Sequence, residues 1–152
     1  MMIPKERLLR EELERQSLLY RSAISSLSKS YEKCTKIGVK DSYEDSELEM
    51  FDSLTTRFAR ASDILIQKIL RLHDEIELEE TGSIIDRINR AEKRGVITSG
   101  ETFKEIRRVR NRIAHEYVIE DLVDLFREVL KYCPILINNL NDIENYSKKY
   151  LK

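Results

Sequence analysis

The stretch DSELEMFDSLTTRFARASDILIQKILRLHDEIEL (residues 45–78) decides the fold of this chain. Its apolar residues recur at intervals of three, four or seven positions, which is the period of one face of an α-helix. The stretch therefore predicts a long amphipathic helix with one buried face. That face consists of Phe51, Leu54, Phe58, Ala61, Leu65, Leu72 and Ile76, with Ile69 beside them.

The same periodicity continues on both sides of this stretch. A first helix is predicted from Pro4, which a first helical turn tolerates, to about Ile37, because Gly38 follows. Downstream, Ser83 is a good N-cap for a short helix that Gly95 ends. These signals give one long helix before the central stretch and one short helix after it.

Two further helices complete the chain. Ser99 can cap the first of them, and the second begins near residues 120–121, where acidic side chains suit a helix N-terminus. Pro134 lies inside the last apolar pattern and is expected to kink or divide that helix. The sequence therefore predicts an all-α, up-and-down bundle of four long helices plus a short fifth helix.

The composition agrees with a helical protein. The chain has 152 residues, of which 36% are charged and 41% hydrophobic, with only four Gly and two Pro to make turns. This length fits a single domain over residues 1–152. Lone Cys34 and Cys133 suit a reducing cytosol, and we see neither a signal peptide nor an apolar run of membrane-spanning length. We therefore expect a cytoplasmic protein without a membrane segment.

The charge of the chain is small but unevenly distributed. The formal net charge is -1, which excludes a globally basic nucleic-acid binder. Residues 41–80 hold twelve acidic and four basic residues, whereas residues 84–115 hold nine basic and four acidic ones. The second segment can present one cationic surface to phosphate, or it can simply be a helix with a solvated basic face.

The segment from Phe103 to Tyr117 does not look like plain scaffold. On a helical wheel its apolar residues form one stripe, and Arg110 lies about 40° from Ile106, at the margin of that stripe. His115 lies on the opposite face, with Asn111 one turn before it. The arrangement places a cation beside the core and an imidazole away from it.

Arg110 needs a partner at that position, because an unpaired buried charge is costly. The partner can be an anionic ligand, or a carboxylate on another helix such as Asp63 or Glu79. The run RRVRNR (residues 107–112) also sets Arg108 and Arg112 four positions apart, which favours a nearby anion.

The combination Arg110-Asn111-Arg112-Ile113-Ala114-His115-Glu116-Tyr117 resembles the R-x4-H-x-Y motif of the HEPN superfamily. The similarity is greatest to HepT-type toxins, which are encoded beside a small nucleotidyltransferase antitoxin. The resemblance implies a metal-independent endoribonuclease that needs no cofactor. The sequence has no cluster of metal-ligating residues of its own.

The resemblance also implies roles for individual residues. His115 would transfer protons, Arg110 would bind the scissile phosphate, and Asn111 would orient the imidazole or the RNA. Three further arginines, Arg107, Arg108 and Arg112, would bind RNA phosphates with little base preference. Asp63 and Gln67, spaced i,i+4 on the second helix, are candidates for a supporting role, or else are part of a solvated surface.

The resemblance implies two protein partners as well. One histidine is few for an acid–base pair, so we expect a homodimer whose two motifs form one cleft. Tyr117 would receive AMP from the nucleotidyltransferase, which would block the cleft with bulk and negative charge. His73 has no motif around it and is expected at the surface.

Two alternatives remain. The chain can be a non-catalytic, HEPN-like substrate-binding or partner subunit of a two-component nucleotidyltransferase, with the motif binding nucleotide phosphate. It can also be a structural helix-bundle interaction protein in which Arg110 and Asn111 serve only salt bridges or caps. An intact Arg110 and His115 favour the ribonuclease.

Overall fold

The computed structural model describes residues 3–115 and 119–151, without the side chains of residues 119 and 120. These residues form helices and contain no β-strand, which confirms the predicted all-α class. In chain order the elements are α1 (Pro4–Ile37), α2 (Asp45–Asp63), the π-helical η1 (Ile64–Ile69), α3 (Leu70–Ile76), α4 (Ile84–Arg94), α5 (Gly100–His115), α6 (Ile119–Asn138), α7 (Leu140–Ser147) and the 3₁₀ helix η2 (Lys148–Tyr150).

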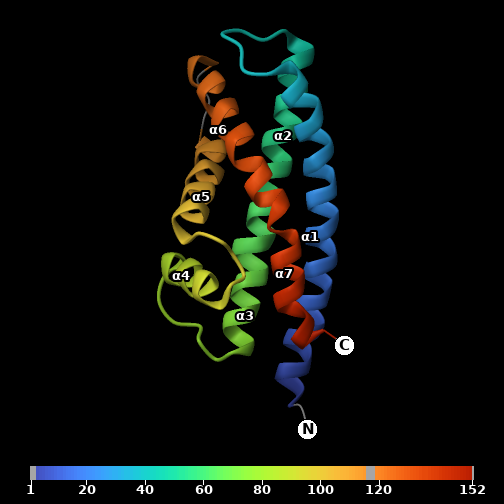
Figure 1. Cartoon of the computed structure of the whole chain (residues 1–152), viewed down its shortest axis with the longest axis vertical. Coiled ribbons are helices and arrows are strands. Elements are labelled where there is room, and N and C mark those ends of the chain that lie inside the picture. The colour runs from blue at the N-terminus through green and yellow to red at the C-terminus, as the bar shows by residue number, and fades with distance from the viewer. Residues whose placement is uncertain (1–2, 116–118, 152) are drawn as a thin grey trace.

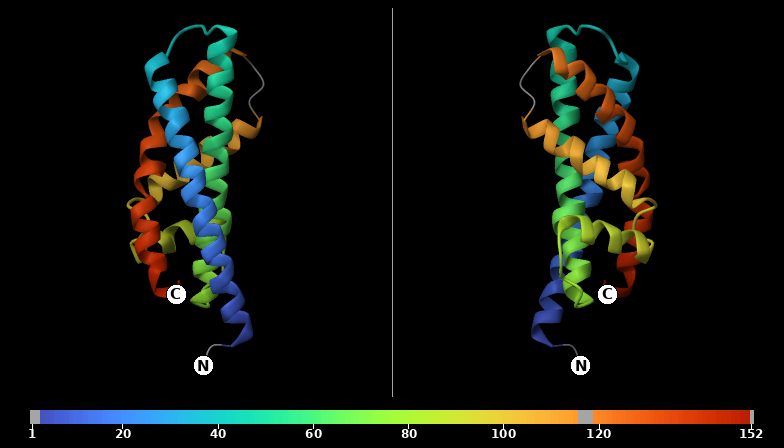
Figure 2. Two further views of the ribbon diagram at one scale, coloured as in Figure 1. Left: turned by 90° about the vertical axis from the view of Figure 1, so that its right-hand side faces the viewer. Right: turned by 90° about the vertical axis from the view of Figure 1, so that its left-hand side faces the viewer.

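The helices are arranged as an up-and-down bundle (Figure 1). The chain ascends through α1, descends through α2, η1 and α3, ascends through α5 and descends through α6 and α7, while the short α4 lies beside α3. Figure 2 shows that α5 is inclined across the long rods, with its C-terminal end beside α2. This confirms the predicted four long helices and a short fifth one.

The core lies between α1, the α2–α3 rod and α6, and it contains the predicted apolar face. Phe51, Phe58 and Leu65 are fully buried, whereas Ile76 near the end of the stretch is half-buried. The ring of Phe51 stacks on Phe126 of α6 with centroids 4.4 Å apart. Offset aromatic contacts of this kind add to the free energy of burial and fix the register of the two helices.

The predicted capping residues set the helix boundaries. In α4, the Ser83 hydroxyl accepts a hydrogen bond from the Asp86 backbone N–H, and the Asp86 carboxylate accepts one from the Ser83 backbone. Gly95 follows α4 in the left-handed conformation, at φ 78°, which costs glycine little. The Ser99 hydroxyl accepts from the Thr102 backbone N–H at the start of α5.

Two elements differ from the prediction. The 34-residue stretch is not an uninterrupted α-helix, because the π-helical η1 separates α2 from α3. In the last rod, α6 continues through Pro134, and the division comes at Asn139, whose side chain donates to the carbonyl of buried Val96. Losing one backbone hydrogen bond at Pro134 is therefore not enough to end a helix with so long an apolar face.

The prediction that His73 lies at the surface is wrong. His73 is fully buried under α7, and its Nε2 is 2.9 Å from the hydroxyl oxygen of Ser147. A π turn takes in one residue more than an α turn, so residues after η1 are rotated relative to a regular wheel. That rotation brings His73 into the core side of α3.

None of the helices in the described part of the chain is both long enough and apolar enough to cross a membrane.

Candidate functional site

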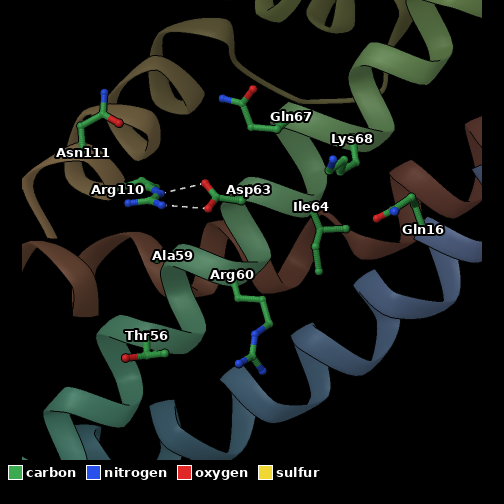
Figure 3. A pocket seen from close by; sticks show the side chains of 10 residues that line it. All are labelled: Gln16, Thr56, Ala59, Arg60, Asp63, Ile64, Gln67, Lys68, Arg110 and Asn111. Atoms are coloured by element: carbon green, nitrogen blue, oxygen red, sulfur yellow. Dashed lines mark hydrogen bonds and ion pairs between the residues drawn. The ribbon is translucent and has the colours of Figure 1, made fainter. Parts of the chain in front are cut away.

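An open pocket lies between α1, α2, η1 and α5 (Figure 3). Its volume is about 750 Å³. Four of the predicted site residues line it together, namely Asp63, Gln67, Arg110 and Asn111. The rest of the lining, which the sequence did not indicate, consists of Gln16, Thr56, Ala59, Arg60, Ile64 and Lys68.

Arg110 and Asp63 form the central pair of this pocket. The Nε and Nη2 atoms of Arg110 donate to the two carboxylate oxygens of Asp63 at 2.7 and 2.9 Å. These hydrogen bonds raise the pKa of Arg110 above its ordinary value. Asp63 is thus the carboxylate that Arg110 was expected to need, and the other candidate, Glu79, pairs with Arg94 instead.

The Arg110–Asp63 pair faces solvent rather than the core. The side chains of Arg110 and Asp63 are 28% and 42% exposed. A guanidinium has five N–H bonds, and Asp63 engages two of them. Nη1 has no acceptor among the described residues, so Arg110 is oriented by Asp63 and can still donate to an anion in the pocket.

The π-helical η1 forms one wall of the pocket. The backbone N–H of Leu70 donates to the carbonyl of Leu65, five residues back, as in a π turn. Ile64, Gln67 and Lys68 of η1 all line the pocket, directly after Asp63. Such segments are rare and are frequently found at functional sites, which makes this wall of the pocket notable in its own right.

The other motif residues lie at different places on α5. Asn111 is exposed and lines the pocket beside Arg110. His115, the last residue of α5, is exposed but is not part of the pocket lining. Tyr117 lies outside the described residues. The structure therefore places Arg110 and Asn111 in the pocket lining of one protomer and His115 outside that lining, one helical turn beyond Asn111.

Two of the arginines expected to bind RNA are already bound to carboxylates. Arg108 donates to Glu105 and to Glu128 of α6, and Arg112 donates to Glu128 at 2.6 Å. Asp124 of α6 also pairs with Arg112. The Glu128 carboxylate is therefore the anion that offsets the repulsion between Arg108 and Arg112, which are four positions apart on α5. For Arg107, which is half-buried, no ion pair exists within residues 3–115 and 119–151.

Sequence reasoning missed a second polar cluster, between α3, α4 and α7. Asp74 is 1% exposed and accepts hydrogen bonds from Arg90 and Arg94 of α4, two of them at 2.7 and 2.6 Å. Burial alone would raise the pKa of Asp74, but those hydrogen bonds hold it below its ordinary value. Arg90 and Arg94 follow Asp74 by 16 and 20 positions, and spacings this long form no periodic pattern. The sequence alone therefore could not reveal the cluster.

The fold and pocket together define a class, a helical bundle with an open pocket whose lining holds three cations and one carboxylate. No protein-family model matches the chain, and neither the curated proteins nor the solved structures gave a match. Within the described ranges, no group of three or more His, Cys, Asp or Glu side chains is placed to hold a metal ion.

Proposed function

We propose that this chain is a metal-independent endoribonuclease of the HEPN type, acting as the toxin of a toxin–antitoxin pair. The observation that carries the proposal is the Arg110 guanidinium, held by Asp63 at the wall of an open cationic pocket with N–H groups still available. A guanidinium held in this way is suited to the charged oxygens of a phosphodiester.

The reaction would be an attack of an RNA 2′-hydroxyl on the adjacent phosphorus. The new O2′–P bond forms as the P–O5′ bond breaks, which leaves a 2′,3′-cyclic phosphate and a 5′-hydroxyl end. One base must accept the 2′ proton, and one acid must give a proton to the leaving O5′. Arg110 would stabilise the negative charge on the phosphoryl oxygens, and His115 would carry the proton transfers.

A homodimer would bring a histidine to the pocket, which His115 of the same protomer does not line. In one protomer the pocket lining contains Arg110 and Asn111 but not His115, which is exposed at the end of α5. A two-fold axis near that end would bring the histidine of each protomer toward the motif of the other. Full activity in a strictly monomeric preparation would rule this arrangement out.

Tyr117 would be the site of inactivation by a partner nucleotidyltransferase. Its phenol oxygen would attack the α-phosphorus of ATP, and pyrophosphate would leave, so that an AMP group is attached two residues beyond His115. Bulk and negative charge there would repel RNA. Mass spectrometry after incubation with ATP and the transferase should show one added AMP in wild type and none in Tyr117→Phe.

A second candidate is the non-catalytic binding subunit. The observation in its favour is that His115 does not line the pocket with Arg110, so the described lining can bind a nucleotide phosphate but contains no imidazole. The third reading, a purely structural role, is favoured by the Arg110–Asp63 ion pair itself.

A growth assay separates these candidates. Wild type, Arg110→Ala, His115→Ala and Tyr117→Phe are expressed from an inducible promoter, and total RNA is examined in parallel. We expect growth arrest and RNA cleavage with wild type and neither with Arg110→Ala or His115→Ala. Intact RNA and normal growth with all four folded, AMP-free proteins would contradict the ribonuclease and leave the binding subunit or the structural role.

A further inference from the structure

The pocket contains two cations that lie outside the R-x4-H-x-Y motif. Arg60 of α2 and Lys68 of η1 are exposed, and both line the pocket on the rod that faces α5. In the part of the chain that the structure describes, neither forms an ion pair. Lys68 acts electrostatically on Glu12, whose carboxylate is already hydrogen-bonded to Arg15 and Gln16.

These two cations differ from the arginines of α5 in their availability. A phosphate that approaches Arg108 or Arg112 must displace the Glu128 carboxylate, which binds both of them. A phosphate that approaches Arg60 or Lys68 breaks no ion pair within the described residues. The favourable release of counterions from a polyanion is therefore available at Arg60 and Lys68 without the loss of an existing ion pair.

The positions of Arg60 and Lys68 suit an extended polyanion. Eight residues separate them, an axial distance of roughly 12 Å at the α-helical rise, so they bind separate phosphates rather than one. Figure 3 shows them on opposite sides of Asp63 along the rod, with Arg110 reaching in from α5. The three cations of the lining are therefore spread along the pocket rather than gathered at one point.

We propose that Arg60 and Lys68 bind the phosphates on either side of the one bound by Arg110, so that a single-stranded RNA crosses α2 and η1 along the pocket. This inference deepens the proposed ribonuclease function and rests on it. The exposed amide side chains of Gln67 and Asn111 line the same path and can contact base edges, which a duplex would conceal. Among the described residues, the pocket lining has no aromatic ring for base stacking, so we expect a mainly electrostatic affinity.

Binding is measured with an RNA that cannot be cleaved. The probe is a fluorescent single strand of about 12 nucleotides, within the usual site size of such proteins. Its 2′-O-methyl sugars block the attacking hydroxyl. Anisotropy titrations at several salt concentrations compare wild type with the double variant Arg60→Gln/Lys68→Gln. Both residues are exposed and unpaired among the described residues, so the variant should fold normally, as circular dichroism will verify.

A matched variant loses two positive charges elsewhere. Lys29→Gln/Lys36→Gln removes exposed lysines of α1. We expect Arg60→Gln/Lys68→Gln to weaken binding at least tenfold at low salt. It should also flatten the plot of log K against log salt by about 1.4, which is two charges at ~0.7 each. The matched variant should change the affinity less than threefold.

Binding by Arg60→Gln/Lys68→Gln equal to wild type would overturn the inference, as would an equal loss in Lys29→Gln/Lys36→Gln. Cleavage of the same RNA with free 2′-hydroxyls is measured separately. If wild type cleaves but Arg60 and Lys68 do not affect binding, the inference fails and the ribonuclease stands. If the double variant loses binding but nothing is cleaved, the phosphate path stands and the catalytic proposal fails.

Discussion

The molecule contains two arginine–carboxylate sites whose surroundings differ. Asp74 is buried between α3 and α4, where Arg90 and Arg94 bind both of its oxygens. Asp63 is partly exposed at the pocket, and its one partner, Arg110, keeps N–H groups available. The difference teaches that an ion pair closed off from solvent fixes helices together, whereas an open one can orient a side chain toward a ligand.

The buried site should give the largest effect on stability. Asp74→Asn removes the full negative charge that Arg90 and Arg94 share and leaves Arg94 with only Glu77 and Glu79, so we expect a loss of about 3–5 kcal/mol in the free energy of unfolding. Urea denaturation followed by circular dichroism measures it. Asp63→Asn is the matched change at the open site and should cost less than about 1 kcal/mol. Similar losses for the two variants would remove the distinction between the sites.

The free energy of unfolding should also depend on pH, through His73 next to the buried Asp74. Burial lowers the pKa of His73 to about 4, against 6.5 for an ordinary histidine. As pH falls, the unfolded state therefore takes up this proton first, so stability is fully present above pH 6.5 and is lost between pH 6.5 and about 4. The shift corresponds to about 3 kcal/mol over that window.

Denaturation midpoints between pH 7 and pH 5 check this prediction. The neighbouring carboxylates with lowered pKa values, buried Asp74 and half-buried Glu77, contribute their own loss only at lower pH. His73→Gln should flatten the profile, whereas His115→Ala, at the exposed end of α5, should keep the wild-type slope. An unchanged slope in His73→Gln would mean that other groups cause the acid sensitivity.

At the open site, substitution of Asp63 should lower the rate of RNA cleavage more than the stability of the fold. Asp63→Ala leaves Arg110 without the carboxylate that orients it, so we expect RNA cleavage to fall about tenfold, less than for the loss of a direct oxyanion donor. Single-turnover cleavage assays measure the change, and Arg110→Ala sets the lower limit. Cleavage by Asp63→Ala at the wild-type rate would show that Arg110 needs no positioning.

The smallest effect is expected at Glu128 of α6, which belongs to neither site. Glu128→Gln removes the carboxylate that Arg108 and Arg112 share, at a cost of about 1 kcal/mol for a partly exposed network. Freed of that carboxylate, the two arginines should bind RNA two- to threefold more tightly at low salt, as seen by anisotropy. Weaker binding would indicate that Glu128 orients them for RNA.

Most of the fold was predictable because helix ends and apolar stripes are local signals. Pro4, Ser83, Gly95 and Ser99 act within a turn or two of their own positions, and the structure confirms the boundaries they predict. The π-helical η1 was not predictable, since its residues keep an apolar pattern that also fits an α-helix. The burial of His73 was not predictable either, because no motif surrounds it and its contact with Ser147 joins two different helices.

The site was predictable only in part, because ion pairing between helices depends on tertiary structure. Asp63 was one of two partners considered for Arg110, and the choice between Asp63 and Glu79 needed the packing of α5 against α2. The contact of Glu128 with Arg108 and Arg112 joins different helices, so the helical wheel of α5 alone could not show it. Arg60 and Lys68 carry no motif and are identified only by the pocket.

The arginines of α5 have a mechanical consequence. Arg110 is about 200° around the helix from both Arg108 and Arg112, so α5 is anchored on opposite sides, to α2 and to α6. Any twist of α5 about its own axis would stretch the bonds on both sides at once. The helix therefore resists torsion before any ligand arrives, and an incoming phosphate should find Arg110 already aimed, with little freedom left to lose.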